Sequence, residues 1–189
     1  MHHHLIFEGA ELSGKSWIMS QIYEHLESKY NRSKVVLDGC HWFNCDVGIF
    51  GTEYGKPIIE QYLNITKVLD NTNILMEKLH ISDIVYNRLH FNREVNYVDI
   101  ESRLLKLDFK IIFITFPEDE DVLNKRIQDR INLYPHYERI RKSPNWYINQ
   151  QTEYTKEIKK SNLPHLKIKT DSFPNSSYTK EVLKWIKEL

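Results

Sequence analysis

The sequence has little of several features that would mark a special class of protein. Only two of its 189 residues are cysteines, Cys40 and Cys45, too few for a disulfide framework. No apolar run approaches the ~20 residues that a membrane-spanning helix needs. No signal-peptide cleavage pattern follows residues 2–4, three histidines that look like a tag remnant and that we exclude from functional reasoning. These absences predict a cytoplasmic protein in a reducing compartment, with no membrane partner.

The sequence also lacks an excess of charge of either sign. Lys plus Arg and Asp plus Glu both total 26, so the formal net charge is zero. Nucleic-acid polymers are bound by basic surfaces, and we therefore expect none as a partner. No repeat, low-complexity tract or Pro/Gly/Ser-rich linker divides the sequence, and its length suits one domain. We expect a single domain over residues 1–189 that acts on a small ligand.

The most specific feature is residues 9–16, GAELSGKS, which fill every fixed position of the pattern G-x-x-x-x-G-K-[ST]. An apolar run at residues 5–7 precedes the loop, and apolar residues at helical spacing follow it over residues 17–26. An ordinary glycine-rich turn explains neither the full pattern nor its flanks. The predicted ATP-binding residues are Gly9, Ala10, Glu11, Leu12, Ser13, Gly14, Lys15 and Ser16.

The chemistry of this loop needs each of these residue types. Glycines let the backbone turn tightly, so that amide groups and a helix N-terminus approach phosphate oxygens. In this pattern Lys15 reaches the β- and γ-phosphates, and the Ser16 hydroxyl binds Mg²⁺. The sequence therefore predicts that ATP and Mg²⁺ are bound, with Lys15 as a catalytic residue.

Strands and helices alternate along the rest of the chain. Strands are predicted at residues 5–7, 34–37, 73–76, 109–115 and 166–168, and helices at residues 17–26, at 58–70, after Pro117 and at 178–189. Residues 40–57 are interpreted as a polar and aromatic connection. Near-continuous apolar strands are typical of a parallel sheet covered on both faces. We predict a three-layer α/β/α sandwich with five parallel strands.

Acidic residues end several predicted strands, where ligands bind in such sheets. Glu77, after the third strand, is placed to orient the Mg²⁺ shell, with Ser16 as the direct ligand. A solvated or helix-starting carboxylate is the alternative. Asp38, after the second strand, is placed to orient an acceptor hydroxyl or accept its proton. The alternative is a turn residue, because Asp-Gly is a common turn dipeptide.

Two segments resemble the P-loop nucleoside and nucleotide kinases, in particular the thymidylate kinase and deoxynucleoside kinase group. They are Phe7-Glu8-Gly9 running into Ser13-Gly14-Lys15-Ser16, and Glu77-Lys78 followed by Ser82, Val85 and Tyr86. The resemblance implies transfer of a phosphoryl group from ATP to a nucleoside or nucleoside monophosphate. It also implies that the five parallel strands lie in the order 2-3-1-4-5. Lys78 stands where these kinases usually have arginine, and Asp38-Gly39 stands where they commonly have Glu-Pro. These departures leave the acceptor open.

The resemblance also implies a mobile lid at about residues 126–145, whose arginines stabilise the transferring phosphoryl group. Arg126 and Arg130 are four residues apart and share a face if their helix continues. A solvated helix paired with nearby acids is the alternative. Trp42 and Phe43 are candidates to stack on a planar acceptor, and Lys78 to bind it, although aromatic core packing explains the rings equally well.

Three hypotheses remain for the function. The first is a nucleoside or nucleotide kinase, and the second is a kinase for another small acceptor. The third is a nucleotide-binding regulatory module with weak or no phosphoryl transfer. The presence of Lys78 where these kinases usually have arginine favours this third hypothesis. A homodimer is compatible with each. No zinc site is predicted around Cys40 and Cys45, because a second Cys/His pair at ligand spacing is missing.

Overall fold

The computed structural model describes residues 2–27, 39–45, 48–69 and 71–188. Its strands are β1 (His4–Glu8), β2 (Cys40–Asn44), β3 (Asn73–Glu77), β4 (Phe109–Thr115) and β5 (His165–Lys169). They form one sheet in the order β2-β3-β1-β4-β5, and every pairing is parallel. The predicted fold class and strand order are confirmed.

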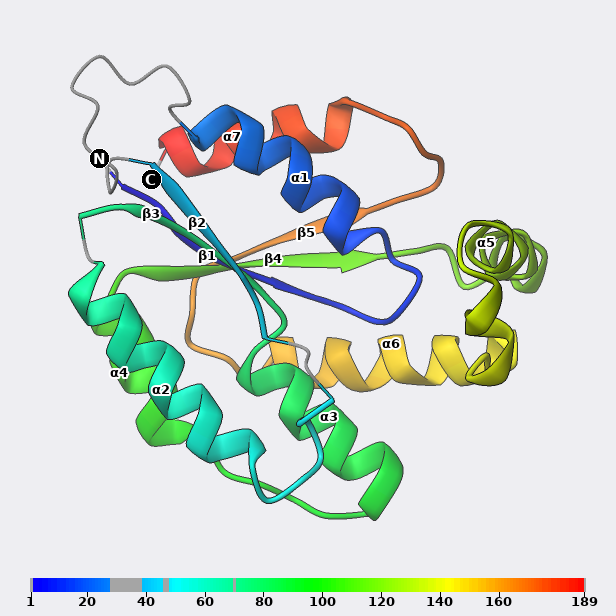
Figure 1. Cartoon of the computed structure of the whole chain (residues 1–189), viewed down its shortest axis with the longest axis horizontal. Coiled ribbons are helices and arrows are strands. Elements are labelled where there is room, and N and C mark those ends of the chain that lie inside the picture. The colour runs from blue at the N-terminus through cyan, green and yellow to red at the C-terminus, as the bar shows by residue number, and fades with distance from the viewer. Residues whose placement is uncertain (1, 28–38, 46–47, 70, 189) are drawn as a thin grey trace.

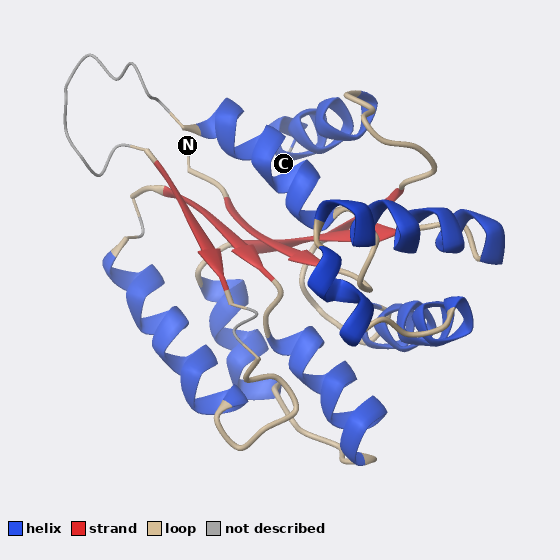
Figure 2. Ribbon diagram, turned by 45° about the vertical axis from the view of Figure 1, so that its right-hand side comes forward, coloured by secondary structure: helices blue, strands red, loops and turns tan. Residues whose placement is uncertain are grey.

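Helices cover both faces of this sheet. They are α1 (Lys15–Leu26), α2 (Gly55–Val68), α3 (His80–Phe91), α4 (Val98–Lys106), α5 (Glu120–Leu133), the 3-10 helix η1 (Pro135–Arg139), α6 (Pro144–Ile158) and α7 (Ser177–Glu188). Figure 1 shows α1 and α7 on one face and α2, α3, α4 and α6 on the other, while α5 lies beyond the carboxyl end of β4. The turned view in Figure 2 shows the same layers. In the part of the chain described, no helix has the length and apolar character to cross a membrane.

Two hydrophobic cores lie on the two faces of the central strands. In β1, Leu5 and Phe7 belong to the core under α1 and α7, and Ile6 belongs to the opposite core. All three side chains are fully buried. Successive side chains of a strand point to opposite faces, so a strand buried on both faces needs a continuous apolar run. This is why the short apolar run before the loop folds as a central strand.

The second strand differs from the prediction. Residues 40–44 form β2, so interpreting residues 40–57 as a connection was wrong at its start, and the strand expected at 34–37 lies outside the described residues. The sequence CHWFN looks polar and aromatic because β2 is an edge strand. Only Cys40 is buried, whereas the other four side chains are partly or largely exposed, so the strand does not need an apolar run.

Candidate functional site

The loop at residues 9–16 joins β1 to α1, as its sequence predicts. Gly9 has φ 142°, and a Cβ there would lie 2.1 Å from the Ile114 carbonyl oxygen of β4. Gly14 has φ 89°, and a Cβ there would lie 2.1 Å from Cζ of Phe173. Both glycines are therefore required by their backbone conformation and by the close approach of neighbouring chain.

Lys15 folds back over the loop. Its Nζ donates hydrogen bonds to the carbonyl oxygens of Gly9 and Ala10, both at 2.7 Å. Burial penalises the ammonium group and, with the nearby positive charge of Lys78, lowers the pKa of Lys15 to about 8. An incoming phosphate would thus meet a desolvated ammonium group whose present partners are neutral: the two carbonyl groups and, at 3.5 Å, the Ser13 hydroxyl.

Ser16 and Glu77, the two predicted metal ligands, lie together. The Ser16 hydroxyl donates a hydrogen bond of 2.5 Å to Oε1 of Glu77 at the carboxyl end of β3. Both side chains are at least partly exposed. A hydroxyl and a carboxylate are oxygen ligands of the kind Mg²⁺ prefers, and this ion commonly takes one or two protein ligands plus phosphate oxygens and water. Among the described residues, no group of three or more His, Cys, Asp or Glu is arranged to hold a metal ion.

Glu8, immediately before the loop, is fully buried and caps the start of α3. Its carboxylate accepts hydrogen bonds from the Leu79 amide at 2.9 Å, the Ser82 amide at 3.3 Å and the Ser82 hydroxyl at 2.5 Å. The Ser82 hydroxyl is also 2.8 Å from the Tyr154 hydroxyl. Burial raises the pKa of Glu8 although these donors oppose the shift. The resemblance drew attention to Glu8 and Ser82, but their direct contact was not predicted.

Glu11 is the centre of a polar network. Its amide donates to Oε1 of Gln150 at 2.8 Å, and its Oε1 accepts from the Tyr86 hydroxyl at 2.8 Å. Lys78 in turn donates to the Tyr86 hydroxyl at 3.1 Å. The Tyr137 hydroxyl, from η1, lies 3.5 Å from Oε2 of Glu11. Tyr86 thereby connects the loop to α3, Gln150 connects it to α6, and Tyr137 connects it to the predicted lid. Sequence reasoning missed the roles of Gln150 and Tyr137.

Arg126 and Arg130 share helix α5, which runs through both positions, but they have different surroundings. Nη1 of Arg126 donates to the Leu12 carbonyl oxygen at 2.9 Å, and Nη2 donates to the Thr170 carbonyl oxygen at 2.7 Å. Burial lowers the pKa of Arg126. Arg130 is exposed, and its Cζ lies 4.5 Å from the centre of the Tyr134 ring. Arg126 therefore contacts the backbone of the loop at residues 9–16, whereas Arg130 contacts aromatic rings within the predicted lid itself.

The candidate acceptor residues of β2 are not brought together. The Trp42 ring lies 6.1 Å from that of Tyr23 on α1, and the Phe43 ring lies 6.0 Å from that of Tyr62 on α2. The two side chains belong to opposite faces of the sheet, so one planar ligand does not stack between them. Asp38 lies outside the described residues.

The revised strand changes which acid follows β2. The strand ends at Asn44, and Cys45 still donates its amide to the Glu77 carbonyl oxygen at 3.1 Å. The next acid in the sequence is Asp46, which also lies outside the described residues. Sequence reasoning missed it because no strand was predicted at residues 40–44.

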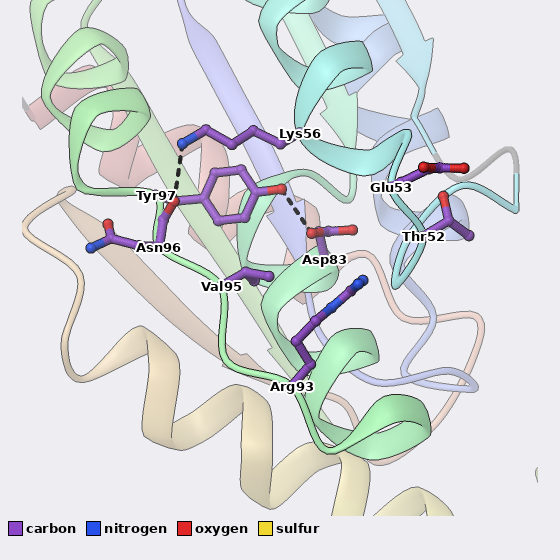
Figure 3. Close-up of a pocket in the computed structure, with 8 residues that line it drawn as sticks. All are labelled: Thr52, Glu53, Lys56, Asp83, Arg93, Val95, Asn96 and Tyr97. Carbon is purple, nitrogen blue, oxygen red and sulfur yellow. Dashed lines mark hydrogen bonds between the residues drawn. The ribbon is translucent and has the colours of Figure 1, made fainter.

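A cavity of about 400 Å³ lies between α2, α3 and the segment before α4 (Figure 3). Its lining residues are Thr52, Glu53, Lys56, Asp83, Arg93, Val95, Asn96 and Tyr97. Asp83 accepts hydrogen bonds from the Tyr97 hydroxyl at 2.7 Å and the Gly51 amide at 2.8 Å, and burial raises its pKa. No residue of the phosphate loop lines this cavity, so it is separate from the loop site.

The sequence matches no family model and no curated protein. Solved structures with the same fold exist, however. The YorR protein of Bacillus subtilis, in complex with phosphorylated GDP, superposes with a TM-score of 0.66 at 15% identity, over 97% of this chain and 95% of that one. A candidate kinase from Chloroflexus aurantiacus superposes with a TM-score of 0.51 at 14% identity, over 100% and 98% of the two chains. At these identities the likeness establishes a shared fold.

Proposed function

We propose that this protein is an ATP- and Mg²⁺-dependent kinase that transfers a phosphoryl group to a nucleoside or nucleoside monophosphate. One observation carries the proposal: a complete phosphate-binding loop turns from β1 into α1 with Lys15 over it and Ser16 bonded to Glu77. The fold shared with YorR, whose structure contains a phosphorylated nucleotide, supports the same reading.

The residues of the loop have separate roles in this proposal. The amides of residues 9–16 and the start of α1 surround the phosphates, and Lys15 leaves the carbonyl groups of Gly9 and Ala10 to bind the β- and γ-phosphates. Ser16 and Glu77 hold Mg²⁺, which neutralises charge on the phosphates when it is bound. The protein takes little part in the covalent chemistry of phosphoryl transfer, so positioning of the two substrates and electrostatic stabilisation supply most of the rate enhancement.

The acceptor side is proposed to lie beyond the carboxyl ends of β2 and β3. Lys78, the residue after β3, donates a hydrogen bond to the Tyr86 hydroxyl, and this hydroxyl donates to Glu11 of the loop. An acceptor bound at this edge of the sheet would therefore lie beside the phosphates. Asp38 was the acid predicted to orient the acceptor hydroxyl, and the position of β2 adds Asp46 as a second candidate.

The lid is proposed to be residues 126–145, with Arg130 as the arginine that reaches the transferring group when the lid closes. Arg130 is exposed and lies on the rings of Tyr134 and Tyr137, and Tyr137 lies near Glu11 of the loop. A movement of residues 129–145 would therefore carry the arginine toward the phosphates. Arg126 would keep its contact with the Leu12 carbonyl oxygen, and the buried Tyr137 hydroxyl would leave its partner, the Tyr147 hydroxyl.

A regulatory nucleotide-binding module is the second candidate function. The observation that favours it is Lys78, which is 5% exposed and bonded to Tyr86. A lysine lacks the planar, bidentate grip of arginine on phosphate, so acceptor binding or transfer would be weak. A kinase for another small acceptor remains the third hypothesis.

Transfer of labelled γ-phosphate from ATP tests the proposal. The protein is incubated with ATP, Mg²⁺ and a panel of nucleosides, nucleoside monophosphates and other small alcohols and phosphates. A labelled nucleotide product that disappears with Lys15→Ala supports the kinase, and a labelled product of another class supports the third hypothesis. ATP binding without transfer to any acceptor favours the regulatory module. If Lys15→Ala turns over as fast as the unaltered protein, the loop is not the site of transfer.

Substitution of the acids separates their roles. Glu77→Gln should lower activity and weaken its dependence on Mg²⁺ together, because the carboxylate belongs to the metal shell. Asp38→Asn and Asp46→Asn should be compared directly: the acid that assists the acceptor lowers turnover when replaced and leaves ATP binding largely intact. Full turnover in both Asn variants would remove both aspartates from the mechanism.

A further inference from the structure

Two side chains outside the loop bind consecutive carbonyl groups within it. Arg126 of α5 donates to the Leu12 carbonyl oxygen at 2.9 Å. The hydroxyl of Thr170, the residue after β5, is 2.9 Å from the Ser13 carbonyl oxygen and also 2.9 Å from the Thr115 carbonyl oxygen, so these two acceptors share its single hydrogen. Arg126 also binds Thr170 twice, through the hydroxyl at 3.2 Å and the carbonyl oxygen at 2.7 Å. The two side chains thus form one unit, which we call the loop clamp.

The clamp fixes the direction of two peptide groups. In a planar trans peptide the carbonyl oxygen and the following amide point in opposite directions. With the Leu12 and Ser13 carbonyl groups held by the clamp, the amides of Ser13 and Gly14 point to the other side of the loop. There the Ser13 amide donates a long hydrogen bond of 3.4 Å to the Ala10 carbonyl oxygen, which a phosphate oxygen would replace. Leu12 has φ 64°, a left-handed conformation unfavourable for leucine, so this orientation needs support from outside the loop.

The chemistry of the clamp suits arginine and threonine. Arg126 uses Nη1 on the Leu12 carbonyl and the Thr170 hydroxyl and Nη2 on the Thr170 carbonyl. The planar guanidinium group reaches these acceptors from two nitrogen atoms at fixed positions, whereas a lysine would have to reach all of them from a single nitrogen atom. Thr170 is fully buried, so its hydroxyl has no direct access to a ligand in solution. Arg126 is further covered by the Phe173 ring, 5.3 Å from its Cζ.

We propose that Arg126 and Thr170 are positioning residues, which orient the loop amides toward phosphate and do not touch the transferred phosphoryl group. This inference rests on the proposed function, since it concerns phosphate bound at residues 9–16. It replaces the direct phosphate contact that the sequence predicted for Arg126 and leaves that role to Arg130. The loop amides hold phosphates that ADP and ATP share, so loss of the clamp lowers the binding affinity for both nucleotides by the same factor.

Calorimetric titration with ADP and with ATP, both with Mg²⁺, tests the clamp. Arg126→Lys and Thr170→Val should each lower the affinity for ADP and the affinity for ATP by the same factor, about 10-fold. This is the scale of one lost hydrogen bond in a buried polar site. Thr170→Ser keeps the hydroxyl and should restore most of the affinity lost in Thr170→Val. Lys125→Gln removes a positive charge from the neighbouring position of α5 and should bind both nucleotides as the unaltered protein does.

Each contrary result has a distinct meaning. An Arg126→Lys variant that loses affinity for ATP but binds ADP normally would indicate a direct contact with the terminal phosphate and would overturn the clamp. A Thr170→Ser variant as weak as Thr170→Val would also overturn it, because the hydroxyl would then be irrelevant. Thermal unfolding of every variant identifies loss of the fold, and the conservative Lys and Ser variants keep the test decisive if Thr170→Val unfolds. If the unaltered protein binds neither nucleotide, the proposed function itself fails.

Discussion

Lys15 should make nucleotide binding depend on pH in a range where lysines are normally fully charged. Its pKa in the free protein is about 8, against 10.5 for an ordinary lysine, because the ammonium group is buried. The free protein then carries the charge in about 90% of molecules at pH 7, half at pH 8 and about 10% at pH 9. Bound phosphate favours the charged form and raises the pKa again, so binding at pH 8 takes up about half a proton.

The expected magnitude follows from this titration. If binding requires the ammonium form, affinity for ATP with Mg²⁺ falls about tenfold between pH 7 and pH 9. Calorimetry in two buffers with different enthalpies of ionisation measures both the affinity and the proton uptake. Lys15→Arg is the matched control, because a guanidinium group stays charged throughout this range and should give a flat profile.

The same shift has a cost for the free protein. A lysine pKa lowered from 10.5 to about 8 means that charged Lys15 destabilises the fold by roughly 3 kcal/mol at neutral pH. Since the folded state binds fewer protons than the unfolded state between these two values, this contribution makes the fold more stable as the pH rises through that window. A wild-type affinity as flat as that of Lys15→Arg, without proton uptake at pH 8, would refute the reasoning.

Three further predictions concern the surroundings of the loop. Ser82→Ala removes a hydroxyl donor from the buried Glu8 carboxylate and should lower the free energy of unfolding by about 1–3 kcal/mol in a urea titration, whereas an unchanged midpoint would contradict this role. Gly14→Ala should weaken ATP binding, and adding Phe173→Ala should recover only part of the loss, because φ 89° remains unfavourable after the clash is removed; full recovery would show that the clash alone mattered. Amides of residues 129–145 should gain protection from hydrogen exchange when ATP and acceptor are both bound, and equal protection with and without ligands would remove the lid from the mechanism.

The loop and the central sheet were predictable because their residues are dictated locally. Gly9 and Gly14 occupy backbone conformations and close approaches that other residues do not tolerate, so the sequence pattern carries the geometry. The central strands are buried on both faces and appear as apolar runs. The order of the strands followed from the resemblance to P-loop kinases.

Helix α6 was not predicted, for a physical reason. Its buried face combines Tyr147, Tyr154 and Ile158 with four polar residues. These are Gln150, Gln151, Glu153 and Glu157, and they interrupt the apolar spacing by which a helix is recognised. Their oxygen atoms accept hydrogen bonds from partners elsewhere in the chain, among them Arg88 of α3, which donates to Glu153 and Glu157. Gln150, for example, accepts from the amide of Glu11, 139 residues away in the sequence.

The contacts around the loop were also unpredictable, because the partners lie far apart in the sequence. The pattern indicates that Lys15 and Ser16 face phosphate, but nothing local to Arg126 indicates that its partners are Leu12 and Thr170. Only the packing of α5 and the end of β5 against the loop brings these groups together. A sequence pattern thus specifies the residues that meet the ligand more readily than those that hold them in place.

A crystal structure with Mg²⁺ and a non-hydrolysable ATP analogue would test the central claim most directly. The account predicts that the β- and γ-phosphates lie in the loop at residues 9–16, with Lys15 Nζ moved from the Gly9 and Ala10 carbonyl oxygens to phosphate oxygens. Mg²⁺ should lie on the Ser16 hydroxyl oxygen beside Glu77. A nucleotide bound elsewhere, or a triphosphate in the loop with Lys15 still bonded to both carbonyl groups, would contradict it.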